Sequence, residues 1–563
     1  MTRPVSATIP HLTRIDWRIA IVGALLVLGI TAVPYLVGYL TTPPGLEYGG
    51  FIFYADDYNS YLAKMHQGAE GSWVYQIPYT VQEHDGGAVY LFYLALGHLA
   101  AATGLSLVAV WHLARWACGL IFLPTVYAFL ATFLRHRAQR KVAYLLVCFS
   151  AGIGWVFPLL GFPTLGDTTP LDLWVVEGYA FLSTLTFPHF ALASALLVAT
   201  VALGGAAIRQ GRLRTGIWAG LLGLALVAVQ PYNIVTVAGV LGGYWLLLAT
   251  VRRRIPWRGL TALVLVGLLP LPLVLYDLYV FAVDPVYRAW AQGNQCPSPN
   301  PLHYLIAYGL LWPLALAGLW YYARRRARRR DEHKLLVVAW LVCGTLLLYA
   351  PVDFQRRLVQ GLQIPLCILA TEGLLRYLLP AIGRSRWVGV LAQASRSRYD
   401  RSSLRRFALN GMLLFCSATS LALWSIANAQ VLAHSFPFYH EVGENQALDW
   451  LATRTARSDA VLASYEEANY VPARAGNRVY AGHWAETPGI RAKMQALDTF
   501  YDAQTSDDWR ETFLAQNRIR YLVQGPRERA LGAFDPAGKS YLIQRFSANE
   551  FTVYKVQFRM LER

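Results

Sequence analysis

The residues best suited to chemistry are two adjacent carboxylates, Asp56 and Asp57. An apolar stripe follows them at the helical spacing i, i+3, i+4 and i+7: Tyr58, Tyr61, Leu62 and Met65. This pattern predicts a helix that starts at the acid pair, where carboxylates can cap unpaired backbone N–H groups. A cap needs only one acid, so the second would be free to bind a hydroxyl group or a cation. Both acids are candidate site residues, and Tyr61 is a candidate ligand-binding residue.

Acidic residues also gather in the segment 161–190, which contains no Lys or Arg. Asp172 and Glu177 lie five residues apart around an apolar LWVV sequence. His189 follows Pro188 where the next apolar run begins. A histidine in that place either packs at the membrane interface or binds a ligand, so Asp172, Glu177 and His189 are all candidate site residues.

Two adjacent arginines, Arg356 and Arg357, occur in the sequence DFQRRLVQG. A guanidinium group binds phosphate through two parallel hydrogen bonds, so the pair suits an anionic headgroup. Snorkelling of both side chains to the phosphates of the surrounding lipid is the alternative. Gln230, at the end of another apolar run, is a further candidate for substrate binding.

Membrane-spanning helices must position these candidates, because the composition is that of a membrane protein. Of 563 residues, 55% are hydrophobic and 15% are charged, and the mean hydropathy is +0.35. The short apolar run 88–103 predicts an interfacial or re-entrant helix. Apolar runs long enough to cross a bilayer, about 20 residues, predict eleven spans at about 18–40, 107–134, 141–160, 187–206, 215–230, 231–250, 259–283, 302–322, 335–351, 362–380 and 407–428.

The distribution of charge predicts how these spans are oriented. The net charge of +17 lies entirely in the first 428 residues, since residues 429–563 hold 16 basic and 16 acidic side chains. The basic residues cluster between apolar runs, as the positive-inside rule expects of cytoplasmic loops. We therefore expect a multi-pass cell-membrane protein with its N-terminus in the cytoplasm and the loops 41–87 and 161–186 outside. The clusters fit this topology better than a polybasic nucleic-acid site, so no nucleic-acid partner is expected.

Residues 429–563 have the pattern of a soluble module. Short strands are predicted at DAVLAS (459–464), NRVYAG (477–482) and RYLVQG (520–525), with helices between them. This alternation predicts a small extracytoplasmic α/β domain over 429–563, beside a polytopic membrane domain over 1–428.

The sequence GHWAET (482–487) follows one of the predicted strands, where ligand-contacting loops often lie. Its His483 and Glu486 either contact an acceptor or serve in capping and packing.

The six cysteines are too few for a disulfide scaffold, and no essential disulfide is expected.

The chain resembles membrane glycosyltransferases of the GT-C fold, which include protein mannosyltransferases, lipid A aminoarabinose transferases and oligosaccharyltransferase catalytic subunits. The resemblance lies in a long first outer loop with the acid pair, followed by Gly-x-x-Gly-x-Trp (Gly68, Gly71, Trp73), and in a second acidic outer loop. Many spans and an outer C-terminal domain complete it. No WWD sequence of the oligosaccharyltransferase type occurs in 429–563, which argues against that branch.

The resemblance implies a hexosyltransferase-type enzyme that uses a polyprenyl-phosphate-linked sugar donor. Asp56 or Asp57 would act as general base or acceptor-binding residue, and Asp172 or Glu177 would position the acceptor or a metal. The donor phosphate would lie near Arg356 and Arg357, and one displacement at the anomeric carbon would transfer the sugar with inversion. A divalent cation is left open as a cofactor, because carboxylates are at hand but no His/Cys ligand spacing is present.

Two other classes remain as alternatives. A transporter or flippase would also need many spans, although internal repeats are absent and the acids gather in outer loops rather than at the midplane. A surface-polysaccharide polymerase or ligase would share the membrane partners and the lipid-linked substrate. The acceptor of the transferase would be a glycan, a lipid or a protein.

Overall fold

The computed structural model describes residues 12–324, 329–386, 390 and 401–558. Within them, two compact units can be distinguished. The first unit contains residues up to Val33, Ala114–Val274 and Cys296–Ile426, and the second contains Pro34–Leu113, Leu275–Gln295 and the residues from Ala427 onward. The predicted cytoplasmic bases Arg3 and several of those between 384 and 406 lie outside the described residues.

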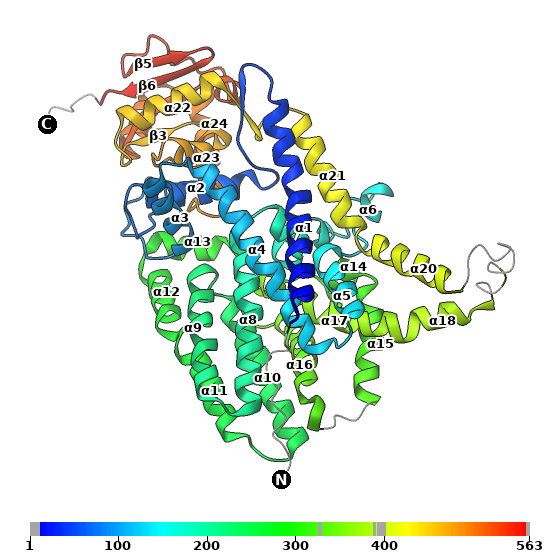
Figure 1. The fold of residues 1–563 in the computed structure, drawn as a ribbon. Coiled ribbons are helices and arrows are strands. Elements are labelled where there is room, and N and C mark those ends of the chain that lie inside the picture. The colour runs from blue at the N-terminus through cyan, green and yellow to red at the C-terminus, as the bar shows by residue number, and fades with distance from the viewer. Residues whose placement is uncertain (1–11, 325–328, 387–389, 391–400, 559–563) are drawn as a thin grey trace. The chain divides into compact units, whose positions relative to one another are not determined.

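The first unit is helical (Figure 1). Its helix α8 (Pro188–Gln210) illustrates how the sequence sets helix ends: Pro188 occupies the first turn, where no N–H is needed, and Gly211 follows the last turn at φ 66°. Helices wholly in this unit are α5 (Arg137–Phe149), α6 (Val156–Leu159), α7 (Ala180–Leu185), α8, α9 (Leu213–Val229), α10 (Asn233–Arg252), α11 (Trp257–Leu268), α14 (Pro301–Tyr308), α15 (Leu311–Arg324), α16 (Leu335–Leu347), α17 (Gln363–Gly373), α18 (Leu379–Arg384) and α20 (Arg401–Cys416).

Some helices run through both units, and short 3₁₀ or π turns join others. The shared helices are α1 (Arg14–Thr41), α4 (Leu107–Phe133), α12 (Leu271–Val283) and α21 (Ala418–Leu432). The short turns are η1 (Leu171–Leu173), η2 (Val176–Gly178), η3 (Arg329–Lys334), η4 (Gln355–Val359) and η5 (Leu374–Leu378).

The helices are those of a multi-pass membrane protein, but the predicted number of eleven spans is not confirmed. Five described helices are long and apolar enough to cross a bilayer, or up to eight if each bent pair counts as one span. Three predicted spans contain only shorter helices: α5 with 13 residues, α9 with 17 and α16 with 13. The run 88–103 forms the 13-residue helix α3 (Leu91–Thr103), which has the predicted short length.

The second unit combines a mixed sheet with helices. Its four-stranded sheet has the order β3-β4-β6-β5, with β3 and β4 parallel and the other pairs antiparallel. The strands of this unit are β1 (Leu46–Tyr48), β2 (Tyr439–Glu441), β3 (Ala460–Leu462), β4 (Ile519–Gln524), β5 (Leu542–Ala548) and β6 (Phe551–Val556). Its helices are α2 (Ala55–Ala69), α3, α13 (Pro285–Gly293), α22 (Val442–Arg454), α23 (Tyr465–Arg474), α24 (Ile490–Tyr501), α25 (Asp507–Gln516) and α26 (Pro526–Leu531).

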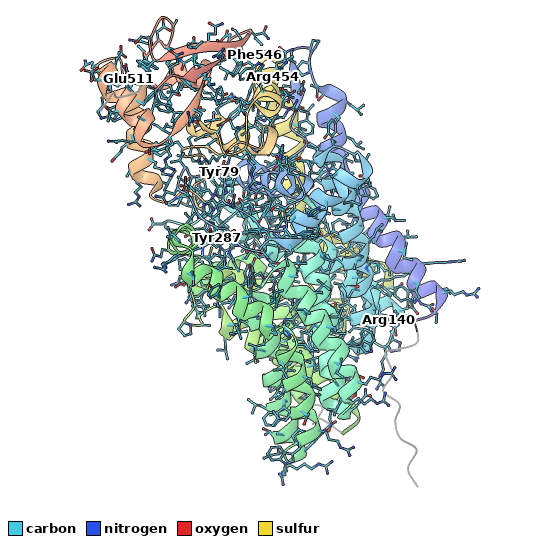
Figure 2. All side chains as sticks on the ribbon, turned by 90° about the vertical axis from the view of Figure 1, so that its left-hand side faces the viewer. Tyr79, Arg140, Tyr287, Arg454, Glu511 and Phe546 are labelled. Carbon is cyan, nitrogen blue, oxygen red and sulfur yellow. The ribbon has the colours of Figure 1, made fainter. Side chains whose placement is uncertain are left out.

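Strand β3 lies within the predicted segment 459–464, and β4 overlaps the predicted segment 520–525 but begins one residue earlier. The predicted strand 477–482 forms one bridge, between Val479 and Val461. The β5–β6 hairpin was not predicted. Its Phe546, labelled in Figure 2, stacks on Trp450 of α22 with ring centroids 6.2 Å apart. The antiparallel pair β1–β2 adds Leu46–Tyr48 of the first predicted outer loop to residues after 427. The predicted boundary at residue 429 stays a prediction.

Helices α2 and α3 pack with their backbones in close approach. A Cβ atom at Gly97 would lie 2.0 Å from the carbonyl oxygen of Met65, and one at Gly68 would lie 2.1 Å from that of Leu94. The predicted apolar stripe of α2 is confirmed, since Tyr58, Leu62 and Met65 are buried. Because the acid pair lies on α2, this packing fixes the helix that carries it.

Gly97→Ala should therefore destabilise the protein by about 1–3 kcal/mol, since overpacking a close contact costs more than alanine's helix propensity returns. The matched control is Gly242→Ala in α10, where a new Cβ meets no atom within 4 Å. Thermal unfolding of both variants in detergent measures the difference. Equal melting temperatures for the two variants would contradict the close approach.

Candidate active site

The acid pair lies in the first turn of α2. The helix begins at Ala55, and Tyr54 occupies the N-cap position with φ 46° and no side-chain cap. The alternative that the acids serve as N-cap residues is not supported, because Tyr54 occupies the N-cap position and both acids lie inside the helix. Their negative charge still interacts favourably with the positive end of the helix dipole.

The two acids have different surroundings. Asp56 accepts a hydrogen bond of 2.7 Å from the hydroxyl of Tyr465, the first residue of α23. Burial raises the pKa of Asp56, and the carboxylates of Asp57 and Glu466 add to this, against the opposing effects of Tyr465 and His483. The side chain of Asp57 is 43% exposed. Both acids are partly exposed, and Asp56 differs from Asp57 in that the Tyr465 hydroxyl holds it.

His483 faces Asp57 with its Nε2 atom, 3.7 Å from the Asp57 Oδ1 atom. Its Nδ1 atom accepts hydrogen bonds of 3.1 Å from the backbone N–H groups of Ala485 and Glu486. A ring nitrogen that accepts carries no proton, so the neutral ring has its proton on Nε2. This buried Nε2 atom has no hydrogen-bond partner among the described residues. The loop thus aims an unused N–H donor at the exposed acid.

A buried ion pair holds this loop against α2. The Lys64 ammonium lies 2.7 Å from Glu486 Oε1, and both side chains are almost inaccessible to solvent. Ser60 donates to the same oxygen at 2.7 Å, and the Tyr75 hydroxyl donates to the other at 2.6 Å. The rings of Tyr75 and Tyr90 lie 4.6 Å and 4.4 Å from the ammonium. Such complete partnering offsets the cost of desolvating two charges.

The neighbours of Glu486 favour its charged form. Burial would raise the pKa of Glu486, but Lys64, His483 and Tyr75 outweigh it and lower the pKa to about 2. Burial lowers the pKa of Lys64, against the attraction of Glu486 and Asp57. The ammonium therefore also contributes positive charge beside Asp57.

Further aromatic and amide side chains lie near His483 and on α2. Tyr79, labelled in Figure 2, lies with its ring 5.4 Å from that of His483 and donates a hydrogen bond to the Asn469 carbonyl at 3.2 Å. Asn59 of α2 donates to the Asn469 side chain at 2.8 Å. Tyr61, the predicted substrate-binding residue, stacks on Tyr93 at 4.3 Å and is half-buried.

The predicted residues of the second outer loop lie in the first unit. Asp172 is buried, and its Oδ2 atom accepts hydrogen bonds from the Gly154 N–H at 2.9 Å and the Thr419 hydroxyl at 2.8 Å. Burial raises its pKa to about 6. These contacts tie the loop to two neighbouring segments, which favours a positioning role for Asp172. His189 is buried in α8, with its ring 4.0 Å from that of Phe190.

Arg356 lines a cavity of about 500 Å³ in the first unit. Its guanidinium lies 4.2 Å from the ring centre of Trp174, and its buried Nε atom has no hydrogen-bond partner among the described residues. The other lining residues are Asp167, Thr168, Thr169, Leu171, Trp174, Pro297, Ser298 and Pro299. The cavity lining thus holds one guanidinium, that of Arg356, and one carboxylate, that of Asp167; a guanidinium group can bind an anionic ligand.

Arg357 is linked to Gln230 through Tyr232. Its guanidinium reaches the Tyr232 hydroxyl at 3.5 Å, and the Gln230 amide donates to the same hydroxyl. Glu177 interacts electrostatically with Arg357. The structure thus gathers Glu177, Gln230 and Arg357 around one tyrosine, and only Arg356 of the predicted residues lines the cavity.

Two groups near the acid pair were missed by sequence reasoning. Lys64 and Tyr465 carried no predicted role, and the role of Glu486 was left open. The sequence GHWAET gave one usable signal, a histidine and a glutamate three residues apart after a strand. No group of three or more His, Cys, Asp or Glu side chains able to hold a metal ion occurs in the described part of the chain.

Glu486→Gln should destabilise the protein by about 3–5 kcal/mol, because it leaves the Lys64 ammonium buried without a counter-charge. Replacing both residues, as Lys64→Met with Glu486→Gln, should recover part of the loss. Since folding lowers the pKa of Glu486 from 4.5 to about 2, the stabilisation is complete above pH 4.5 and is lost as the pH falls toward 2. Thermal unfolding from pH 7 to pH 3 measures both effects.

The matched control is Glu550→Gln, which removes an exposed ion pair with Arg529 and should cost less than about 1 kcal/mol. If Glu486→Gln costs no more than this control, the buried pair does not hold the loop.

Comparisons with known proteins show what the fold is. No protein-family model and no curated protein sequence matches the chain. Among solved structures, the apo oligosaccharyltransferase of Archaeoglobus fulgidus has a TM-score of 0.51 at 12% identity, over 96% of this chain and 75% of its own. ArnT of Cupriavidus metallidurans, bound to undecaprenyl phosphate, has a TM-score of 0.50 at 12% identity, over 95% of this chain and 98% of its own. The chain therefore has the GT-C fold of membrane glycosyltransferases.

Proposed function

We propose that the protein is an integral membrane glycosyltransferase that moves a sugar from a polyprenyl-phosphate donor to an acceptor on the outer face of the membrane. The observation that carries the proposal is the half-exposed carboxylate of Asp57, faced by the unused Nε2–H of His483. The GT-C fold supports it, because the chain covers almost the full length of ArnT, which was solved with undecaprenyl phosphate.

Asp57 is the proposed general base. The acceptor hydroxyl would give its proton to Asp57 while its oxygen attacks the anomeric carbon of the donor. The bond from that carbon to the phosphate oxygen would break, and the phosphate would leave with the electron pair. One displacement of this kind inverts the anomeric configuration. Asp56, held by Tyr465, would bind a second acceptor hydroxyl or position the helix end.

His483 is the proposed positioning residue for Asp57. An N–H donor beside one carboxylate oxygen restricts the rotation of the carboxylate, which leaves the other oxygen for the acceptor. Because Nδ1 is occupied by two backbone N–H groups, the ring cannot reverse without breaking both bonds.

The donor phosphate is the proposed ligand of Arg356 and Arg357. Guanidinium groups would stabilise the negative charge that builds on the leaving phosphate. Glu177 and Gln230 would orient Arg357, and Asp172 would fix the loop that carries Trp174. His189 is retained as a proposed substrate-binding residue. The extracytoplasmic position of residues 429–563 and the hexosyl nature of the sugar are parts of the same proposal.

Asp57→Asn should reduce sugar transfer by about 10²–10⁴-fold, the range that a general base contributes. Asp56→Asn should have a smaller effect, because the amide oxygen that it introduces can still accept the hydrogen bond from Tyr465. The assay supplies polyprenyl-phosphate sugars and native membrane extract to the purified protein and follows transferred sugar.

The matched control is Glu83→Gln, since Glu83 is an exposed acid of the same loop and pairs only at the surface with Arg518. It should retain full activity. Full activity of Asp57→Asn, with a stable fold, would remove the base assignment.

Two substitutions separate the roles of the two His483 nitrogens. His483→Asn keeps an acceptor for the backbone N–H groups of Ala485 and Glu486 but lacks the donor near Asp57. It should fold normally and lose about tenfold to a hundredfold in kcat, with the KM for the acceptor unchanged. His483→Gln keeps a donor at the Nε2 position but loses the acceptor, so it should lose stability more than turnover.

Melting temperatures, kcat and the KM for the acceptor, measured for both variants, provide the test. A purely structural role would give the opposite ranking, with turnover following stability in both variants.

A further inference from the structure

An exposed tryptophan stands beside the acid pair and has no role in the proposed mechanism. Trp484 is 49% exposed, although it lies in a loop whose neighbours are buried. Its ring stacks on that of His483 with centroids 6.0 Å apart and an interplanar angle of 20°. His483 in turn faces Asp57. The free area of the indole therefore lies next to the carboxylate that a substrate can reach.

Contacts of the residues on both sides of Trp484 fix the position of the loop 482–487. The backbone of Trp484 lies close enough to the Tyr465 hydroxyl to oppose the rise in its pKa, and this hydroxyl donates to Asp56. On one side, a Cβ at Gly482 would lie 2.6 Å from the backbone of Ala468 in α23. On the other, Glu486 is fixed by Lys64.

The charges around Trp484 restrict the chemistry of that ligand. Asp56 interacts electrostatically with Asp57 and Glu466. The buried cation nearby, Lys64, also interacts with Asp57, but it is paired with Glu486. Three carboxylates disfavour an anionic ligand, and they disfavour the bare chain of a lipid because their desolvation would be uncompensated. Carboxylates accept hydrogen bonds from hydroxyl groups, and an aromatic face packs against the C–H face of a sugar ring.

We infer that Trp484 is a platform for a carbohydrate acceptor without acidic groups, which stacks on the indole and presents a hydroxyl to Asp57. The inference rests on the proposed function and names the acceptor class for the same site. The stacked ring would contribute to acceptor binding and not to the chemical step. Trp484 is therefore a specificity-determining residue.

Binding measurements test the inference without requiring sugar transfer. Saturation-transfer NMR on the full-length protein in detergent would use three probes: mannotriose and chitotriose as neutral oligosaccharides, and trigalacturonate as an anionic one. At least one neutral oligosaccharide should bind, and the anionic one should bind more weakly. Trp484→Leu should weaken the neutral ligand by about tenfold, since an aromatic contact is worth about 0.5–1.5 kcal/mol beyond its buried area. Trp484→Phe should restore part of the affinity.

The matched control is Trp509→Leu, because Trp509 is also partly exposed (38%) and also stacks on an aromatic ring, that of Phe513. It should bind like the unchanged protein. The inference is overturned if no neutral oligosaccharide binds, if trigalacturonate binds best, if a peptide or lipid alone is the acceptor, or if the Trp484 and Trp509 variants behave alike.

Activity separates this inference from the function on which it rests. If transfer occurs and Trp484→Leu raises the KM for the acceptor with kcat unchanged, both stand. If transfer occurs and the KM does not change, the platform is wrong and the glycosyltransferase proposal stands. If neutral oligosaccharides bind through Trp484 but no polyprenyl-phosphate sugar is transferred, the platform stands and the proposed function fails.

Discussion

The candidate site depends on one buried ion pair, between Lys64 of α2 and Glu486 of the loop 482–487. An ammonium group that is fully withdrawn from water needs a counter-charge, and Glu486 provides it from 422 residues away in the chain. Ser60 donates to the same carboxylate oxygen as Lys64, and Tyr75 donates to the other. The pair therefore fixes the relative position of the helix that carries Asp57 and the loop that carries His483.

The surroundings of Glu486, Asp56 and Asp57 differ, so these three acids have different structural and chemical roles. Glu486 is buried and paired with Lys64, Asp56 is held by Tyr465, and Asp57 is half-exposed and faces the Nε2 atom of His483. A base needs both access and orientation, and Asp57 combines partial exposure with a facing donor, whereas the Tyr465 hydroxyl occupies Asp56. In the first unit, Asp172 is likewise bound by the protein, which leaves Arg356 at the cavity as the group best able to meet an anionic ligand.

Local patterns in the sequence predicted α2, its buried stripe, the short helix α3 and the strands β3 and β4, because each depends on spacing within a few residues. The burial of Lys64 could not be predicted, since an isolated lysine in an outer loop is ordinarily solvated and its partner lies in another part of the chain. The same holds for the bond between Asp56 and Tyr465. The acids do not occupy the N-cap position. Tyr54 takes that position in a left-handed conformation, and the helix begins at Ala55, one residue before Asp56. The span count exceeded the five to eight candidates because apolar runs do not reveal where helices end.

A double-mutant cycle between Asp57 and His483, measured by single-turnover transfer from a polyprenyl-phosphate sugar, tests the central claim most directly. If His483 acts only by orienting Asp57, then adding His483→Asn to Asp57→Asn should reduce the rate no further than Asp57→Asn does alone. Independent, multiplying losses from the two substitutions would show that the histidine does not act through this acid, and would contradict the account.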